Sequence, residues 1–93
     1  MSLDAKQVID DLLEVLVVER QAIRTLDGAA VADAAKAKEL FAEQIASVDV
    51  SGFRDELAVL RSELRRNGIL LAHARTCLRE ASSLSQNRVK TKV

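Results

Sequence analysis

Two residues near the C-terminus have side chains that could bind a metal ion. His73 and Cys77 are four positions apart, so on a helix they share one face at the spacing of two zinc ligands. The chain has no second histidine or cysteine, so carboxylates or another subunit would have to complete a zinc site. A nucleophilic Cys77 with His73 as its base would also lack a third group to orient the imidazole. We therefore predict no metal site and no cofactor.

Other residues with reactive side chains give no sign of an enzyme either. Acidic pairs such as Asp10 and Glu14 fall on a solvated helix face, and the sequence has no glycine-rich phosphate loop. Tyrosine and tryptophan are absent, and Phe41 and Phe53 are the only aromatic residues. The sequence therefore predicts a protein that is not an enzyme.

Charge is distributed unevenly along the chain. Residues 1–27 and 28–60 each contain six acidic and three basic residues, whereas residues 61–93 contain two acidic and eight basic ones. Either the helices complement one another and end in a basic tail, or the basic third guides the protein toward an acidic partner. Zero net charge and the lack of aromatic residues among the arginines argue against nucleic-acid binding.

The stretch from Phe53 to Leu84 organises the rest of the chain. Its apolar residues recur at alternating steps of four and three, which is the heptad pattern of a helix that packs along one seam. At 1.5 Å per residue, a helix over these 32 residues would be roughly 48 Å long. Asn67 is the one polar residue on the seam. The seam consists of Phe53, Leu57, Leu60, Leu64, Asn67, Leu71, Ala74, Leu78 and Ala81.

The upstream residues form two shorter amphipathic patterns, and together the three predict an all-α domain over residues 1–84. The seam of the first pattern is apolar except at Glu19, and the second pattern is rich in alanine. Short connections make successive helices antiparallel, which gives an up-down-up three-helix antiparallel bundle or coiled coil. Residues 85–93 are expected to be a disordered basic tail. The helices are expected at about 4–26, 29–47 and 52–84.

Two short breaks separate the expected helices. In the first break, Gly28 suits a left-handed position at the end of a helix, and Asp27 or Gly28 can cap the helix that follows. In the second break, Asp49 or Ser51 can cap the long helix. Both breaks therefore carry residues whose backbone or side-chain chemistry favours a turn between helices.

The third helix is expected to be longer than the first two, at roughly 48 Å against roughly 35 Å and 30 Å. It starts beside the end of the second helix and runs parallel to the first, so about ten residues at its end should extend beyond the bundle. That part still carries apolar residues such as Leu78 and Leu84. An apolar stripe without intramolecular cover needs a second copy of the chain or another protein, so we predict a partner-binding surface there.

Three pieces of the sequence together resemble a known family. The first helix contains Leu12-Leu13-Glu14, then Glu19-Arg20-Gln21-Ala22-Ile23 and Leu26, and the second helix is rich in alanine, lysine and glutamate. The third helix contains Glu63-Leu64-Arg65-Arg66-Asn67-Gly68-Ile69-Leu70-Leu71. Over most of residues 8–80 this pattern is similar to the FlgN family of flagellar export chaperones.

The resemblance implies a cytoplasmic chaperone of flagellar type III secretion. Members of that family bind the hook-associated proteins of the hook-filament junction, FlgK and FlgL, through their C-terminal helical region. They keep these clients from assembling prematurely and deliver them to the export apparatus. On this chain the implied client-binding residues are Asn67, Leu70, Leu71, Ala74, Leu78 and Ala81.

The same apolar stripe supports an alternative interpretation, in which the protein is a structural coiled-coil adaptor that forms a homodimer. A single cysteine excludes an intramolecular disulfide and fits a reducing cytoplasm. The N-terminus lacks a basic segment followed by an apolar run, so no signal peptide is expected. The most apolar stretch, 12–18, is interrupted by Glu14 and is too short to span a bilayer, so we expect no membrane insertion.

Overall fold

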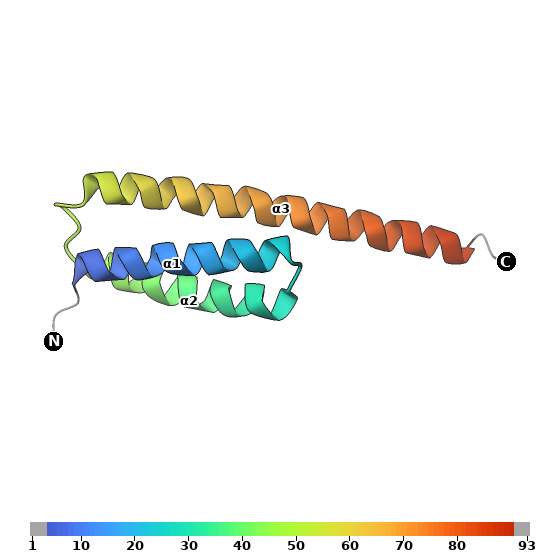
Figure 1. Cartoon of the computed structure of the whole chain (residues 1–93), viewed down its shortest axis with the longest axis horizontal. Helices are drawn as coiled ribbons and strands as arrows, with labels where there is room; N and C mark the ends of the chain where they lie inside the picture. Colours follow the sequence, from blue (N-terminus) through green and yellow to red (C-terminus); the bar gives the residue numbers. More distant parts are fainter. Residues whose placement is uncertain (1–3, 91–93) are drawn as a thin grey trace.

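The computed structural model describes residues 4–90, and within that range the secondary structure is entirely helical. The predicted all-α, up-down-up three-helix bundle is confirmed (Figure 1). The first two helices begin and end within two residues of the expected positions. The three helices are α1 (Ala5–Arg24), α2 (Gly28–Ala46) and α3 (Arg54–Lys90).

The third helix is longer than the sequence predicted. It has 37 residues and continues to Lys90, so residues 85–90 are helical where a disordered tail was expected. Serine and asparagine, which recur over residues 82–87, each cost only about 0.5 kcal/mol in a helix, and no proline or glycine stops the helix there. Residues 91–93, the rest of the expected tail, lie outside the described residues.

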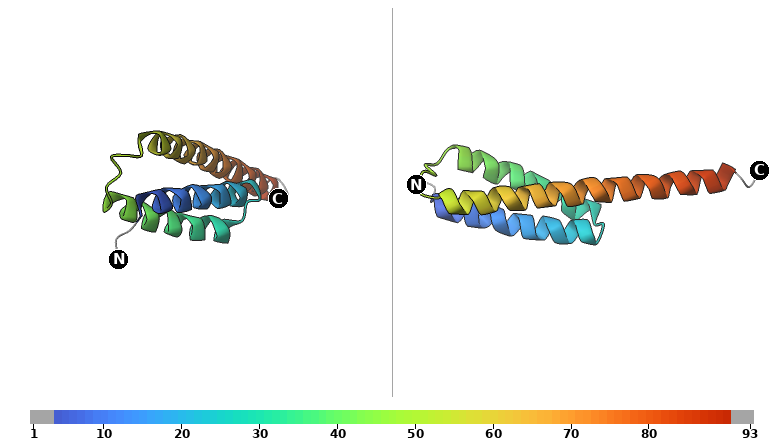
Figure 2. Two further views of the ribbon diagram at one scale, coloured as in Figure 1. Left: turned by 60° about the vertical axis from the view of Figure 1, so that its left-hand side comes forward. Right: turned by 90° about the horizontal axis from the view of Figure 1, so that it is seen from above.

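The first helix lies at the centre of the packing. It contacts both α2 and α3, whereas the backbones of α2 and α3 do not approach one another closely in the described part of the chain. Figures 1 and 2 show α3 running alongside α1 and continuing well past the turn that joins α1 to α2. The molecule is therefore a narrow rod, 65 Å long and 24 by 18 Å across.

Apolar residues at helical spacing explain why α1 can serve two neighbours. Its buried positions recur at steps of three and four, so they form a broad stripe rather than a single line. The densest part of the core joins Leu12 and Leu16 of α1 to Leu60 of α3, and Phe41 and Ile45 of α2 pack against this group. All three helices thus meet around the middle of α1.

The turn between α1 and α2 is tight. Asp27 caps α2 as expected, because its carboxylate accepts a hydrogen bond from the backbone N–H of Ala30 at 3.1 Å. The left-handed position at the end of α1 is Leu26, with φ 55°, and Gly28 is instead the first residue of α2. Backbone N–H groups of Leu26 and Asp27 donate to Ile23 and Ala22 carbonyls at 3.1 and 3.0 Å, which is the Schellman pattern.

Replacing Leu26 with glycine should therefore stabilise the protein by about 1 kcal/mol. A left-handed backbone costs an L-residue about 1 kcal/mol and costs glycine little, and the Leu26 side chain is 58% exposed. The measurement is the midpoint of urea unfolding followed by circular dichroism. Leu40→Gly is the control, because Leu40 is similarly exposed, at 54%, but lies inside α2, where glycine should destabilise the protein by a similar amount. Destabilisation by Leu26→Gly would contradict the strain assigned to this turn.

The connection between α2 and α3 is ordered by Asp49. Its side chain accepts a hydrogen bond from the backbone N–H of Ser51 at 3.0 Å, and this bond lowers the pKa of the Asp49 carboxyl below its ordinary value. The carbonyl of Phe53 accepts the first helical bond of α3, from Leu57 at 2.9 Å. Phe53 thus occupies the cap position for which Asp49 and Ser51 were the candidates, and Asp55 and Glu56 place negative charge in the first turn.

Candidate partner-binding surface

The predicted partner-binding residues divide into those that face the hairpin of α1 and α2 and those that extend past it. Leu70, Leu71 and Ala74 are half-buried. Leu71, Ala74 and Leu78 border a small hollow of about 130 Å³ beside the α1–α2 turn, opposite Ile23, Leu26 and Val31. This hollow is the last place where α3 meets the hairpin, and Leu78 is already 52% exposed there.

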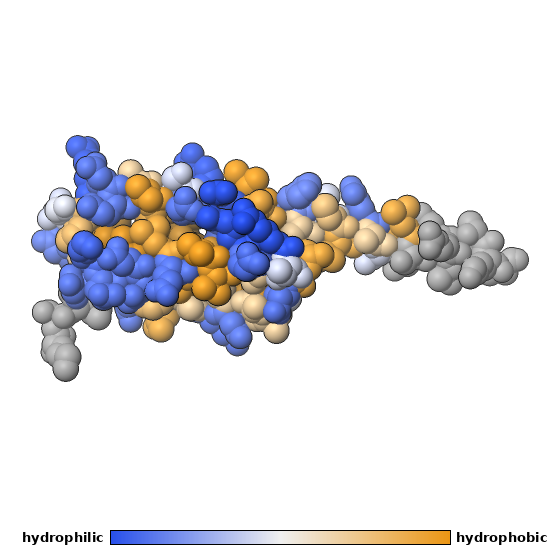
Figure 3. Space-filling view, viewed as in Figure 1, coloured by the Kyte–Doolittle hydropathy of each residue, from blue (hydrophilic) through white to orange (hydrophobic). Residues whose placement is uncertain are grey.

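Beyond Leu78 the described side chains of α3 are all exposed, from Arg79 to Leu84. Leu84 is 70% exposed, and Ala81 lies between it and Leu78. Figure 3 shows orange and tan atoms along this extension, with blue atoms beside them. We call the apolar residues that run from the hollow beside the α1–α2 turn along this extension the α3 stripe; they are Leu71, Ala74, Leu78, Ala81 and Leu84.

Basic side chains border the α3 stripe on one side. Arg75 is four residues after Leu71 and three before Leu78, so its side chain lies next to the apolar row on the helix surface. Arg79 is four residues after Arg75 and lies farther round the same side of the helix, about 100° from Leu78. Arg75 also borders the hollow beside the α1–α2 turn. The end of α3 is thus an amphipathic helix whose apolar row has a positive edge.

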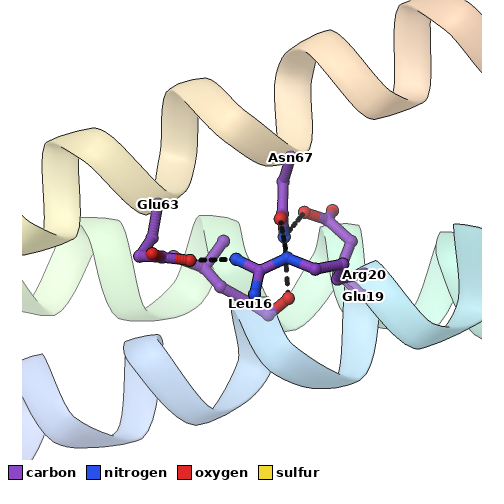
Figure 4. Close-up of polar contacts among 5 residues, drawn as sticks. All are labelled: Leu16, Glu19, Arg20, Glu63 and Asn67. Atoms are coloured by element: carbon purple, nitrogen blue, oxygen red, sulfur yellow. Dashed lines mark hydrogen bonds and ion pairs between the residues drawn. The ribbon is translucent and has the colours of Figure 1, made fainter.

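Asn67 lies beneath this surface, inside the bundle, where it is 1% exposed. Its side-chain N–H groups donate to the Leu16 carbonyl at 2.7 Å and to Glu19 Oε1 at 3.0 Å (Figure 4). Its side-chain carbonyl accepts a hydrogen bond from Arg20 Nε at 3.0 Å. All three bonds cross from α3 to α1, so Asn67, which the sequence suggested as a partner-binding residue, is instead buried in the packing between these two helices.

Charged residues extend the contacts of Asn67 into a network across all three helices. Glu19 is 1% exposed, and its second oxygen accepts a hydrogen bond from Lys38 Nζ of α2 at 2.9 Å. Arg20 forms an ion pair with Glu63, one turn before Asn67 on α3. No buried side-chain nitrogen or oxygen in the described structure is left without a partner. A satisfied buried network of this kind fixes the register of the helices it joins.

The network explains two exceptions in the sequence pattern. Glu19 and Asn67 are the polar residues on two otherwise apolar seams, and the structure shows that they are partners. Glu19 lies 14 residues after the start of α1 and Asn67 lies 13 after the start of α3, so parallel helices bring them to the same level. That nearly equal offset was the signal that could have paired them. Arg20, Lys38 and Glu63 lie off the seams and gave no such signal.

His73 and Cys77 lie on an exposed face of α3. Cys77 Sγ and His73 Nε2 are 3.6 Å apart, and both residues are exposed to solvent. In the described part of the chain, no three side chains of histidine, cysteine, aspartate or glutamate gather in a way that could hold a metal ion. The pair is therefore a local contact along one helix and gives no sign of a larger site.

In comparisons with known proteins, no family model, no curated protein and no solved structure matches the chain. The helices that the structure describes contain no apolar segment long enough to cross a membrane. The exposed end of α3 and the residues that hold this helix against α1 are therefore the features of the described structure that bear on function.

Proposed function

We propose that this protein is a cytoplasmic export chaperone of flagellar type III secretion, and that the α3 stripe binds hook-associated proteins such as FlgK and FlgL. The observation that carries the proposal is the extension of α3 beyond the α1–α2 turn with Leu78 and Leu84 exposed. Such a helix can cover an amphipathic helix of a client, which would otherwise be free to assemble.

The hydrogen-bonded attachment of α3 to α1 suits this role. Asn67 and the residues around it tie α3 to α1 just before the stripe begins, so the stripe is presented on a helix that is already formed. A preformed surface loses less conformational entropy on binding than one that must fold first. Arg75 and Arg79 would speed association with an acidic client helix, because opposite charges steer diffusing partners together.

The experiment that tests the proposal is calorimetry with the terminal helical segments of FlgK and FlgL from the same genome. We expect a single binding site with a dissociation constant below about 1 μM. Leu78→Asp should weaken this binding by about a hundredfold, because it places a charge at the centre of the apolar contact.

Ile69→Asp is the matched control. Ile69 is on the same helix and is 64% exposed, but its position in the heptad places it on the face opposite the stripe. We expect Ile69→Asp to leave client binding unchanged. Equal weakening by both substitutions would show that the α3 stripe is not the binding surface.

A structural coiled-coil adaptor that acts through homodimerisation is the second candidate. The observation in its favour is that the same exposed stripe could be covered by another copy of the chain. No heat of binding with FlgK or FlgL, together with a stable dimer in light scattering, would favour this candidate over the chaperone.

A further inference from the structure

The hairpin of α1 and α2 has a second concave surface, which the proposed function does not use. It is a groove of about 470 Å³ lined by residues of α1 and α2 alone. Its floor includes Val15, Ala34, Ala37 and Phe41, and Val18 on its border is 56% exposed. An apolar groove between two antiparallel helices has the shape that a third helix fills.

The groove lies on the side of α1 away from α3. Val18 borders the groove, and Arg20 binds Asn67 and Glu63 of α3. Two residues span about 200° around a helix, so these two side chains point in nearly opposite directions. The α3 helix of the same chain occupies the other side and extends away from the hairpin (Figure 1), so it does not cover the groove.

Acidic side chains line the rim of the groove on both helices. Asp11 and Glu14 come from α1, Asp33 comes from α2, and no basic residue lines the groove. Asp11 accepts a hydrogen bond from Gln7 at 2.8 Å, and neither Glu14 nor Asp33 forms an ion pair with a described residue. The groove therefore favours a helix with an apolar row and a positive edge.

The end of α3 has these two properties. Leu78 and Ala81 supply the apolar row, and Arg75 supplies the positive edge, to which the long side chain of Arg79 adds charge from farther round the same side of the helix. After Leu78 the helix continues for 12 residues to Lys90, about 18 Å, and the groove extends over the seven-residue step from Asp11 to Val18, about 10 Å. The overhang is thus long enough to cover the groove of another molecule.

We propose that the overhanging end of α3 docks in the α1–α2 groove of a second copy of the chain, and that the exchange is reciprocal. A two-fold axis would then place each α1–α2 hairpin between its own α3 and the α3 of the other copy. The two contacting surfaces of this dimer differ from each other, unlike those of a coiled coil in which the two overhangs pair. If the stripe also binds a client, which depends on the proposed function, the dimer covers the stripe until a client displaces it.

A charge-exchange experiment tests the dimer. The overhang variant carries Arg75→Glu and Arg79→Glu, and the groove variant carries Glu14→Lys and Asp33→Lys; all four residues are exposed, so the fold should be preserved. In sedimentation equilibrium the wild-type protein should be a dimer. Each variant alone should dissociate at least about tenfold more readily, because like charges would face each other at the groove.

An equal mixture of the two variants should form a heterodimer about as stable as the wild-type dimer, because both docked pairs then combine opposite charges. Glu39→Lys with Glu43→Lys is the control, since these exposed acids of α2 lie outside the groove and should leave the dimer unchanged. Circular dichroism of each variant verifies that it is folded.

Two outcomes would overturn the inference. If the groove variant dimerises as well as the wild-type protein, the groove is not the docking site, and direct pairing of the overhangs becomes the better explanation. If the wild-type protein is a monomer throughout the concentration range, no second copy occupies the groove. Neither outcome bears on the chaperone proposal, because binding of FlgK and FlgL segments is measured separately.

Discussion

Replacing Asn67 with leucine should lower the free energy of unfolding by about 3 kcal/mol, although leucine suits the heptad seam better than asparagine. Asn67 supplies one of the hydrogen bonds to Glu19, whose carboxylate is 1% exposed and cannot turn to water. The substitution leaves Glu19 Oε1 and Arg20 Nε without this partner. A buried charged group that loses a hydrogen bond is destabilised by more than the new apolar contact of leucine can offset.

A second substitution separates this mechanism from a simple loss of packing. Adding Glu19→Leu to Asn67→Leu removes the charge that was left unpaired, so the double variant should recover most of the lost stability. Lys38 is 30% exposed and can be hydrated once Glu19 is gone, and Arg20 retains Glu63. Glu19→Leu alone should be destabilising, because it leaves an Asn67 N–H group buried without an acceptor.

Urea unfolding followed by circular dichroism measures these differences. Ser62→Leu is the matched control, because it makes a polar-to-leucine change at an exposed position of the same helix and should alter stability by at most about 0.5 kcal/mol. An Asn67→Leu variant as stable as the wild-type protein would mean that the network contributes nothing to stability. Additive effects of the two substitutions would mean that Glu19 and Asn67 are not coupled.

Leu60→Ala should also cost about 3 kcal/mol of stability. Leu60 is 4% exposed and is the residue of α3 that joins the central core group with Leu12 and Leu16. Shortening its side chain leaves a cavity at the point where all three helices meet. Because α3 contacts only α1 closely in the described structure, the loss should fall mainly on the attachment of α3.

Amide hydrogen exchange together with urea unfolding tests this second expectation. In the Leu60→Ala variant the amides of α3 should lose protection more than those of α1 and α2. Val59→Ala is the matched control, since Val59 is adjacent in sequence and 53% exposed and should change stability by at most about 0.5 kcal/mol. Equal loss of protection in all three helices would show that α3 and the hairpin unfold as one unit.

The three helices could be predicted because the periodicity of apolar residues within each segment is enough to indicate a helix there. The heptad steps from Phe53 to Ala81 specify one packed face of α3, and the seam of α1 does the same. The end of α3 at Lys90 was less predictable, since no residue of the described segment forbids helix there and the preferences of serine and asparagine are weak. The residue at which a helix ends depends on differences of a few tenths of a kcal/mol in helix preference, whereas the formation of the helix depends on the much larger free energy of burying its apolar face.

The residue with the left-handed backbone could not be identified from preference alone. Glycine is favoured at such a position by only about 1 kcal/mol, and the packing of Ile23 in the last turn of α1 outweighs this. The helix therefore ends where its apolar stripe ends, and Leu26 takes the strained position two residues before the glycine. The sequence correctly predicted a turn here, but it wrongly assigned the left-handed position to Gly28 instead of Leu26.

The acidic groove between α1 and α2 could not be predicted from the sequence, for a different reason. The sequence shows where the apolar seam of α1 lies, but the rotation of α2 about its axis decides which residues of α2 border the rest of α1. Alanines lie on several sides of α2, so the sequence defines its rotation poorly, and Ala34 is its one fully buried residue. The rim of Glu14 and Asp33 became visible only when the two helices were placed.

The central position of α1 has a consequence for the order in which the chain folds. The hairpin of α1 and α2 joins neighbours in sequence, whereas Asn67 binds residues about 50 positions earlier, at Leu16 and Glu19. Contacts that close short loops form faster than contacts that close long ones. A growing chain can therefore complete the hairpin on the ribosome before α3 emerges, and the helix that carries the stripe is the last to dock.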